Sequence, residues 1–237
     1  REAETLLALQ ESFQQEAWLL GVFQLYGADA CTVDGAILSS VVPPLTTIFT
    51  DAIARLTGIP PMVVGPGIRT GLNIKAEIHN QLGSDIVASS VAAIAKYPSP
   101  IVMVDMGTAT SLSLIVGSVY EGCIIMPGLA LALDALSERA AALPPISIET
   151  ASPVGLMGHT TEEAMRSGVL YGHASMVDGM LERIEESIGQ SVTTVATGGN
   201  APRILRYCKR PIQYDADLIM TGLYLLYQKN AKKYRKA

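Results

Sequence analysis

The apolar residues in the first half of the chain change between helical and strand-like spacing. Residues 2–26 place leucines and other apolar side chains at mostly helical spacing, which predicts a helix. A short apolar run at 35–44 predicts a strand, and its two closing prolines open a second helix that extends to about Thr57. The run at 61–71 predicts another short strand that leads into a loop rich in glycine and proline.

The spacing then predicts a helix from Asp85 to about Tyr97 and a strand at 100–105. Strands and helices therefore alternate through this part of the chain. Such alternation is typical of an α/β protein with parallel strands.

The second half begins differently, with three apolar runs in close succession. They lie at 101–105, 111–116 and 119–125, and only short turns separate them. Three such runs predict an antiparallel meander. After the meander, the pattern predicts helices at about 128–142 and 161–188.

The end of the chain predicts a strand at 192–197, a turn and helix at 198–208, and a last helix at about 217–230. The second half thus has a meander that the first half lacks. We predict two domains, residues 1–99 and residues 100–237. If the two halves repeat one unit, we expect the opening strands of the first copy to be missing from this chain.

The composition is that of an ordinary globular protein. The chain has 237 residues, 49% of them hydrophobic, and a formal net charge of −5, so it can bury one large core or two modest ones and predicts no nucleic-acid surface. The apolar stretches are too short to cross a bilayer, and the first residues have no signal-peptide pattern. We therefore expect a cytoplasmic protein that binds neither nucleic acid nor membrane.

Several kinds of chemistry lack their usual residues. The three cysteines are widely spaced, without a C-x-x-C pair, which disfavours both a disulfide framework and a zinc site. The three histidines have no metal-like spacing, so we expect structural or solvent-exposed roles for them. Neither G-x-S-x-G nor a complete Walker A sequence is present. These cysteines and histidines are Cys31, Cys123 and Cys208, and His79, His159 and His173.

The segment "IVMVDMGTATSLSLIVG" at 101–117 places a lone carboxylate, Asp105, at the end of an apolar run. Such a carboxylate is costly to bury unless a cation, a hydroxyl or backbone N–H groups pair with it. The turn behind it offers the N–H groups and hydroxyls of Gly107, Thr108 and Thr110, which suit an anion. Gly-Thr turns are also common in ordinary hairpins, so both interpretations stay open.

A second glycine turn, in "TGGNAPRIL" at 197–205, lies between a predicted strand and a predicted helix. Glycines at such a turn let a planar ring or a phosphate lie against the backbone, near the positive end of the helix. A short Gly-Gly turn without any ligand is the alternative.

Asp85, in "LGSDIV", precedes a helix with apolar periodicity. Aspartate is among the best N-cap residues, which gives a structural interpretation. The functional interpretation is a carboxylate that accepts a proton from a substrate hydroxyl during phosphoryl transfer. The two interpretations are compatible.

Seven segments in this order resemble the type III pantothenate kinases, and together they cover nearly the whole chain. They are "SSVVPP" (39–44), "VVGPGIRTGLNI" (63–74), "LGSDIVASSVAA" (82–93), "VDMGTATSL" (104–112), "IIMPGL" (124–129), "TTEEAMRSGVLYG" (160–172) and "TGGNA" (197–201). The resemblance implies an α/β fold of two ribonuclease-H-like halves, as in actin, with a nucleotide cleft between them.

The resemblance also implies a reaction. ATP phosphorylates pantothenate on its terminal hydroxyl, the first step of coenzyme A synthesis. The family resemblance implies a homodimer that uses Mg²⁺ with ATP and a monovalent cation, K⁺ or NH₄⁺.

On the pantothenate side, the resemblance implies that Asp85 is the proton acceptor and that the segment around it contacts the substrate. This segment consists of Gly83, Ser84, Asp85 and Ile86. Thr161 matches a threonine that reaches pantothenate from the partner subunit.

On the ATP side, Asp105 matches a ligand of the monovalent cation, and Gly107 and Thr108 match the second phosphate turn. The turn of Gly198, Gly199 and Asn200 lies where the family receives adenosine.

The sequence departs from the family in two places. Ile86 stands where the family usually has an arginine, whose loss would cost about 2–3 kcal/mol of binding to the substrate carboxylate. The family's first phosphate loop, Asp-x-Gly-Asn-Thr, has no counterpart in these residues. Two alternatives therefore stay open: a non-catalytic regulatory or binding homologue, and a kinase of this fold that acts on another hydroxyl substrate.

Overall fold

The computed structural model describes residues 15–27, 29–75, 82–148 and 154–231, and they form two compact units. The described parts of unit 1 are the residues up to 72, residues 82–92 and the residues from 218 onward. The described parts of unit 2 are residues 73–75 and 93–217, apart from the gap after 148. Each unit is treated separately below.

Unit 1 combines a small parallel sheet with helices. Its elements are a helix at 15–25, the 3-10 turn η1 (Ala30–Thr32), β1 (Ile37–Leu38), α2 (Pro43–Thr57), β2 (Met62–Val63), the first part of α3 (Ser84–Lys96) and α7 (Leu218–Asn230). β1 pairs with β2 in parallel, as the alternating pattern predicted.

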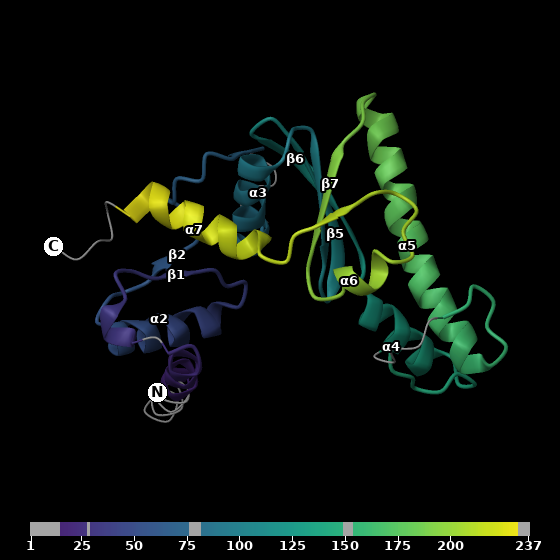
Figure 1. Ribbon diagram of the computed structural model, residues 1–237, viewed down its shortest axis with the longest axis horizontal. Coiled ribbons are helices and arrows are strands. Elements are labelled where there is room, and N and C mark those ends of the chain that lie inside the picture. Colours follow the sequence, from purple (N-terminus) through teal and green to yellow (C-terminus); the bar gives the residue numbers. More distant parts are fainter. Residues whose placement is uncertain (1–14, 28, 76–81, 149–153, 232–237) are drawn as a thin grey trace. The chain divides into compact units, whose positions relative to one another are not determined.

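The two proline residues and the glycine that bound α2 set its limits. Proline occupies the first helical positions, where its missing N–H costs nothing, and Gly58 ends the helix at φ 71°. The helix at 15–25 packs beside α2 through a Glu16–Arg55 ion pair of 3.2 Å and an edge-on contact between Trp18 and Phe49. Figure 1 shows this purple helix beside α2. The start of the helix predicted at 2–26 lies outside the described residues.

The last helix, α7, belongs to unit 1, although the sequence halves 1–99 and 100–237 separate it from that unit. Gly222 allows the close approach, because a Cβ there would lie 1.8 Å from the carbonyl oxygen of Ala88 on α3. At the helix end, the Asn230 side chain accepts from the Arg69 N–H at 3.0 Å and donates to the Arg69 carbonyl at 3.0 Å. Contacts between residues distant in sequence, which periodicity does not encode, thus place α7.

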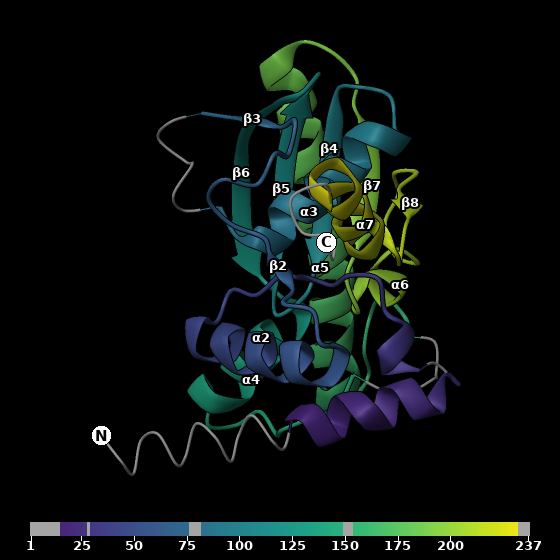
Figure 2. The ribbon, with the colours of Figure 1, turned by 90° about the vertical axis from the view of Figure 1, so that its left-hand side faces the viewer.

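Unit 2 is built on a sheet of six strands in the order β3-β6-β5-β4-β7-β8. Its elements are β3 (Asn73–Ile74), β4 (Ile101–Met106), β5 (Ala109–Val116), β6 (Val119–Pro127), α4 (Leu129–Arg139), α5 (Thr161–Ile188), β7 (Thr193–Thr197), α6 (Ala201–Ile204) and β8 (Gln213–Tyr214). β4, β5 and β6 form the predicted antiparallel meander, and β7 and β8 continue it in parallel from β4. Figure 2 shows β3 beside β6 at the far edge.

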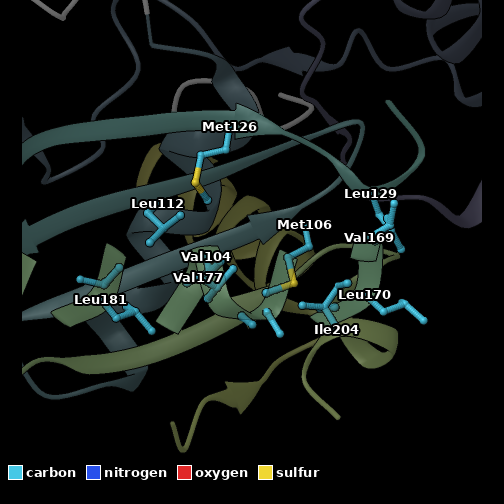
Figure 3. Close-up of a cluster of buried hydrophobic side chains, with 14 of the residues drawn as sticks. Val104, Met106, Leu112, Met126, Leu129, Val169, Leu170, Val177, Leu181 and Ile204 are labelled. Atoms are coloured by element: carbon cyan, nitrogen blue, oxygen red, sulfur yellow. The ribbon is translucent and has the colours of Figure 1, made fainter. Parts of the chain in front are cut away.

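This strand order is the ribonuclease-H-like arrangement, so the predicted α/β fold class is confirmed. The apolar face of α5 covers one face of the sheet together with α4 and α6 (Figures 1 and 3). Val104, Met106 and Leu112 from the strands meet Val177 and Leu181 from α5 in this cluster.

Three details differ from the sequence prediction. The turn and helix predicted at 198–208 contain only a short helix, α6, which ends at Ile204. Beyond it, the Asp178 carboxylate accepts from the N–H groups of Lys209 (2.8 Å) and Arg210 (3.3 Å), which holds the chain in a non-helical path. The helix predicted at 128–142 ends at Arg139. The short strands β3 and β8 have no apolar run to reveal them.

No described helix combines the length and the hydropathy needed to cross a bilayer.

Candidate functional site

The two glycine turns singled out in the sequence lie side by side in unit 2. β4 and β7 are parallel neighbours in which Asp105 pairs with Thr197, so the turns that follow them leave the same edge of the sheet. Asn200 joins the turns: its backbone N–H donates to the Met106 carbonyl at 3.1 Å, and its side-chain amide donates to the Gly107 carbonyl at 3.2 Å. Asn200 is therefore a brace between the turns as well as a member of one.

Asp105 places its carboxylate against the second turn. A Cβ on Gly198 would lie 2.7 Å from Asp105 Oδ1 and 2.7 Å from the Met106 carbonyl oxygen. Gly198 also has a φ of +94°, which side chains rarely adopt. Glycine is thus required at 198 for two independent reasons, and two oxygens line the space beside it.

The strand β6 brings a third segment to the same place. A Cβ on Gly128, the residue before α4, would lie 2.1 Å from the Thr108 carbonyl oxygen and 2.7 Å from that of Gly107. The first turn is thereby held from one side by Gly128 and from the other by Asn200. The sequence interpretation did not assign Gly128, although "IIMPGL" contains it, because its contact crosses from one strand end to another.

The atoms that remain accessible belong mainly to the backbone. Thr108 and Gly199 are exposed, and Gly107 is half-buried. The Gly107 N–H donates back to the Ala109 carbonyl at 3.0 Å, which closes a tight turn. Two adjacent turns of this kind offer a surface of backbone groups to a flat or anionic ligand.

His173, on the buried face of α5, lies beneath the first turn. Its Nε2 is 2.9 Å from Oγ1 of Thr110, the first buried residue after the turn, while Nδ1 is buried without a partner among the described residues. Burial lowers the pKa of His173, so the ring is neutral near pH 7. An unpaired buried polar atom costs about 1–3 kcal/mol, more than the ~0.5–1.5 kcal/mol that a neutral hydrogen bond contributes. The predicted structural role of His173 therefore includes a specific polar contact.

The residues predicted to contact pantothenate around Asp85 lie in unit 1, where hydroxyl groups connect two segments. Ser39, just after β1, has its hydroxyl 2.8 Å from that of Ser84, and the Ser84 hydroxyl donates to the Ser40 carbonyl at 3.1 Å. This network fixes the first residue of α3 to the end of β1. Ser39 and Ser40 belong to the "SSVVPP" segment, but no sequence pattern assigned a role to either residue individually.

Asp85 is not the N-cap of α3, because the helix already begins at Ser84 and the Gly83 carbonyl accepts its first bond, from Val87, at 3.1 Å. The Asp85 carboxylate still bonds a first-turn N–H: its Oδ1 accepts from Ile86 at 2.8 Å. A Cβ on Gly83 would lie 2.3 Å from the same oxygen. Glycine at 83 therefore leaves room for the half-buried carboxylate of Asp85.

Thr161 is the first residue of α5 and is exposed. The capping role falls to Thr160, whose side chain accepts from the Glu163 N–H at 3.2 Å, while Glu163 accepts in return from His159 and Thr160. These backbone hydrogen bonds lower the pKa of Glu163. The capping box holds the corner that presents Thr161, and it leaves the Thr161 hydroxyl out of the capping bonds.

Metal-binding clusters are not found in the part of the chain that the structure describes: no three of its His, Cys, Asp and Glu side chains gather closely enough to hold an ion. Cys31 and Cys123 are exposed, and burial raises the pKa of the Cys208 thiol to about 12. His79 lies outside the described residues.

The ribonuclease-H-like sheet with paired turns at its edge belongs to a phosphotransferase, as the family match shows. The chain belongs to the type III pantothenate kinase family, whose profile matches residues 6–183.

Individual relatives agree with the family. The chain is 41% identical to a type III pantothenate kinase from Exiguobacterium sp. over 84% of its own length and 78% of the relative's. It is also 41% identical to one from Bacillus cytotoxicus, over 84% of this chain and 76% of the relative. A solved Campylobacter jejuni structure, named for the Baf family of transcriptional activators, aligns with 73% of this chain and 74% of its own at a TM-score of 0.52 and 21% identity, which indicates a shared fold.

Proposed function

We propose that this protein transfers the terminal phosphoryl group of ATP to the terminal hydroxyl of pantothenate, the first step of coenzyme A synthesis. The observation that carries the proposal is the pair of turns after β4 and β7, joined by Asn200 in a chain of the type III pantothenate kinase family. Phosphoryl transfer needs little covalent chemistry from a protein and depends on positioning and charge neutralisation. Two locked turns suit that task.

The ATP site is proposed at these turns. Gly107 and Thr108 would bind phosphates, and Gly198, Gly199 and Asn200 would receive the adenosine. Their support is the exposure of Thr108 and Gly199 and the open space at the position where a Cβ on Gly199 would lie. Adenosine can approach the backbone closely where no Cβ intervenes.

Mg²⁺ with ATP and a monovalent cation, K⁺ or NH₄⁺, complete the proposal. The Asp105 carboxylate and the Met106 carbonyl both lie beside Gly198, and oxygen atoms are the donors that hard cations prefer. Asp105 would hold the monovalent cation here. When bound, the cations supply positive charge that neutralises the phosphates.

Asp85 is proposed as the proton acceptor for the pantothenate hydroxyl, with Gly83, Ser84 and Ile86 lining the substrate. The support is the half-buried carboxylate at the first turn of α3 and the room that Gly83 leaves beside it. A carboxylate within hydrogen-bond reach of a substrate hydroxyl can orient it and take its proton as the oxygen attacks phosphorus.

A homodimer is also proposed, in which Thr161 reaches the pantothenate held by the other subunit. Its support is the exposed position of Thr161 at a rigid helix corner. The cytoplasm stays the predicted location.

The test is a coupled kinase assay with full-length protein, pantothenate, Mg-ATP and K⁺. We expect turnover that requires the monovalent cation and saturates with both substrates. Protein that binds ATP but shows no turnover at millimolar pantothenate would contradict the proposal. Sedimentation of the same sample tests the dimer.

Ile86 favours a second candidate, a kinase that acts on another hydroxyl compound. An aliphatic side chain next to Asp85 in the chain, where the family usually has a guanidinium, removes one partner for a substrate carboxylate. Profiling pantothenate analogues and uncharged polyols separates the two candidates. ATP binding without turnover on any of these hydroxyls would instead support the non-catalytic alternative.

A further inference from the structure

We infer that His173 is a positioning residue for the nucleotide: it holds the Gly107–Thr108 turn in shape through the hydroxyl of Thr110. This inference rests on the ATP site proposed above. His173 itself does not contact the nucleotide, because both it and Thr110 are buried beneath the turn.

The contact is specific. Nε2 of His173 lies 2.9 Å from Oγ1 of Thr110, and Thr110 is fully buried. Thr110 pairs with Met106 across the hairpin, so its position fixes the closing pair of the turn that carries Gly107 and Thr108. A shift of Thr110 would move that pair, and with it the Met106 carbonyl to which Asn200 is bonded.

The surroundings of His173 argue against a role in packing alone. The face of α5 that meets the sheet is otherwise apolar near this position, because Val169, Leu170, Ala174 and Val177, all within about one helical turn of His173, are buried. An aliphatic side chain would fill such a place without leaving Nδ1 buried and unpaired among the described residues. Because the unpaired nitrogen costs more than the single hydrogen bond contributes, stability does not explain the imidazole. Local costs of this kind are expected where a site is being held in shape.

The neutral ring explains how the contact works. Burial lowers the pKa of His173, so one ring nitrogen donates and the other accepts. A neutral His–Thr pair is bidirectional, since the hydroxyl can rotate to match either tautomer. The pair therefore fixes position without adding charge beneath a turn that is proposed to bind an anion.

Substitutions at both partners test the inference in the full-length protein. His173→Leu removes the hydrogen bond, Thr110→Val removes it from the other side with little change in volume, and His173→Gln retains an amide that can reach Thr110. Leu181→Ala is the control, because Leu181 is buried on the same helix and Figure 3 shows it at the end of the cluster that is away from Met106. Steady-state kinetics and calorimetric ATP titration are measured for each variant.

We expect His173→Leu and Thr110→Val each to raise KM for ATP by about tenfold, with kcat and KM for pantothenate changed by less than about twofold. His173→Gln restores most of the ATP affinity. The double variant is no worse than either single variant, because both remove the same bond. Leu181→Ala lowers stability and leaves both KM values near those of the wild type.

Two results would overturn the inference: KM for ATP within about twofold of wild type in a folded His173→Leu protein, or equal increases in both KM values. If His173→Leu does not fold, Thr110→Val and His173→Gln decide in the same way. Wild-type protein that binds no ATP would overturn the proposed function and this inference together. If the wild type binds ATP and the variants bind it equally well, the inference alone would be overturned.

Discussion

The proposed pantothenate side in unit 1 and the proposed ATP side in unit 2 differ in the groups that determine their geometry. Around Asp85, hydroxyl side chains determine the geometry: Ser39 and Ser84 fix the start of α3 to a sheet of only two short strands. Around Gly107, the backbone determines it, because carbonyl groups and glycines from three strand ends interlock at the edge of a six-stranded sheet.

This difference bears on which positions can vary. A site made of backbone groups tolerates side-chain changes that leave its glycines in place. It does not tolerate a Cβ at a glycine whose backbone contacts another segment of the chain. A site made of side chains changes its chemistry with a single residue, as Ile86 beside Asp85 illustrates. We therefore expect substrate choice to be decided in unit 1 and nucleotide geometry in unit 2.

The largest expected effect separates the two regions most sharply. Asp85→Asn removes the proposed proton acceptor while keeping the hydrogen bond to the Ile86 N–H within reach of the amide oxygen. We expect kcat to fall by about 10²- to 10⁴-fold with ATP affinity unchanged. Asp51→Asn, at an exposed carboxylate on α2, is the matched control and should retain wild-type kcat. A kcat within tenfold of wild type in Asp85→Asn would show that another group takes the proton.

The second prediction addresses the backbone-built side. Gly128→Ala places a Cβ against the carbonyl oxygens of Thr108 and Gly107, so the turn must shift. We expect ATP affinity to fall more than about tenfold and the free energy of unfolding to fall by about 1–3 kcal/mol. Titration of ATP and denaturant unfolding provide the two measurements.

Gly179→Ala is the matched control for that prediction, since Gly179 lies within α5 with open space around it. Alanine there is expected to be neutral or to stabilise by up to about 1 kcal/mol, because alanine is the better helix former. Equal ATP affinity in both variants would contradict the close approach of Gly128 as the determinant of turn shape.

Asn200→Ala gives a smaller effect within the same region. It removes the side-chain bond to the Gly107 carbonyl but keeps the backbone bond to Met106. We expect KM for ATP to rise about three- to tenfold and KM for pantothenate to stay constant. If KM for pantothenate changed more than KM for ATP, the proposed role of Asn200 on the ATP side would be wrong.

The sequence predicted those parts of the fold that local patterns encode. The prolines and Gly58 located α2 at both ends, and three apolar runs with short turns located the meander. β8 was missed because its two residues are exposed and are held only by pairing with β7. Periodicity has no means of detecting a strand of that length.

At the candidate site, sequence reasoning found the turns but not what holds them. Asp105 and Gly198 were identified separately, and their contact follows from the parallel pairing of β4 and β7. Gly128 was left unassigned, and His173 was given only a structural or solvent-exposed role, because their partners are distant in sequence. In the case of Asp85, the N-cap prediction was wrong by two positions, since Gly83 precedes the first helical residue, Ser84, and accepts the first helical bond.

The smallest expected effect concerns acid, and it applies to unit 2. The pKa of His173 is lowered by burial, so the folded state binds this proton only at a lower pH than the unfolded chain does. The unfolded state therefore gains a proton first as pH falls below about 6.5, and stability declines by up to about 1.4 kcal/mol per pH unit. Carboxylates add a second decline at lower pH.

For Asp215, burial alone would raise the pKa, but hydrogen bonds from Lys96 and Tyr97 outweigh it and hold the pKa below its ordinary value. The bond from Arg210 likewise lowers the pKa of Glu185. The contribution of these two carboxylates to stability is complete above a pH of about 4, the pKa of a carboxyl group in the unfolded chain. It is lost as the pH falls through their lowered pKa values in the folded state. The two declines are thus separated by pH.

Denaturant unfolding at pH 7.5 and 5.5 isolates the histidine contribution. The wild type is expected to lose about 1 kcal/mol between these pH values, and His173→Leu to lose less, because it has no imidazole to protonate. If His173→Leu and the wild type lose the same amount, the buried ring is protonated as readily in the folded state as in the unfolded state, and the neutral contact with Thr110 does not limit stability in acid.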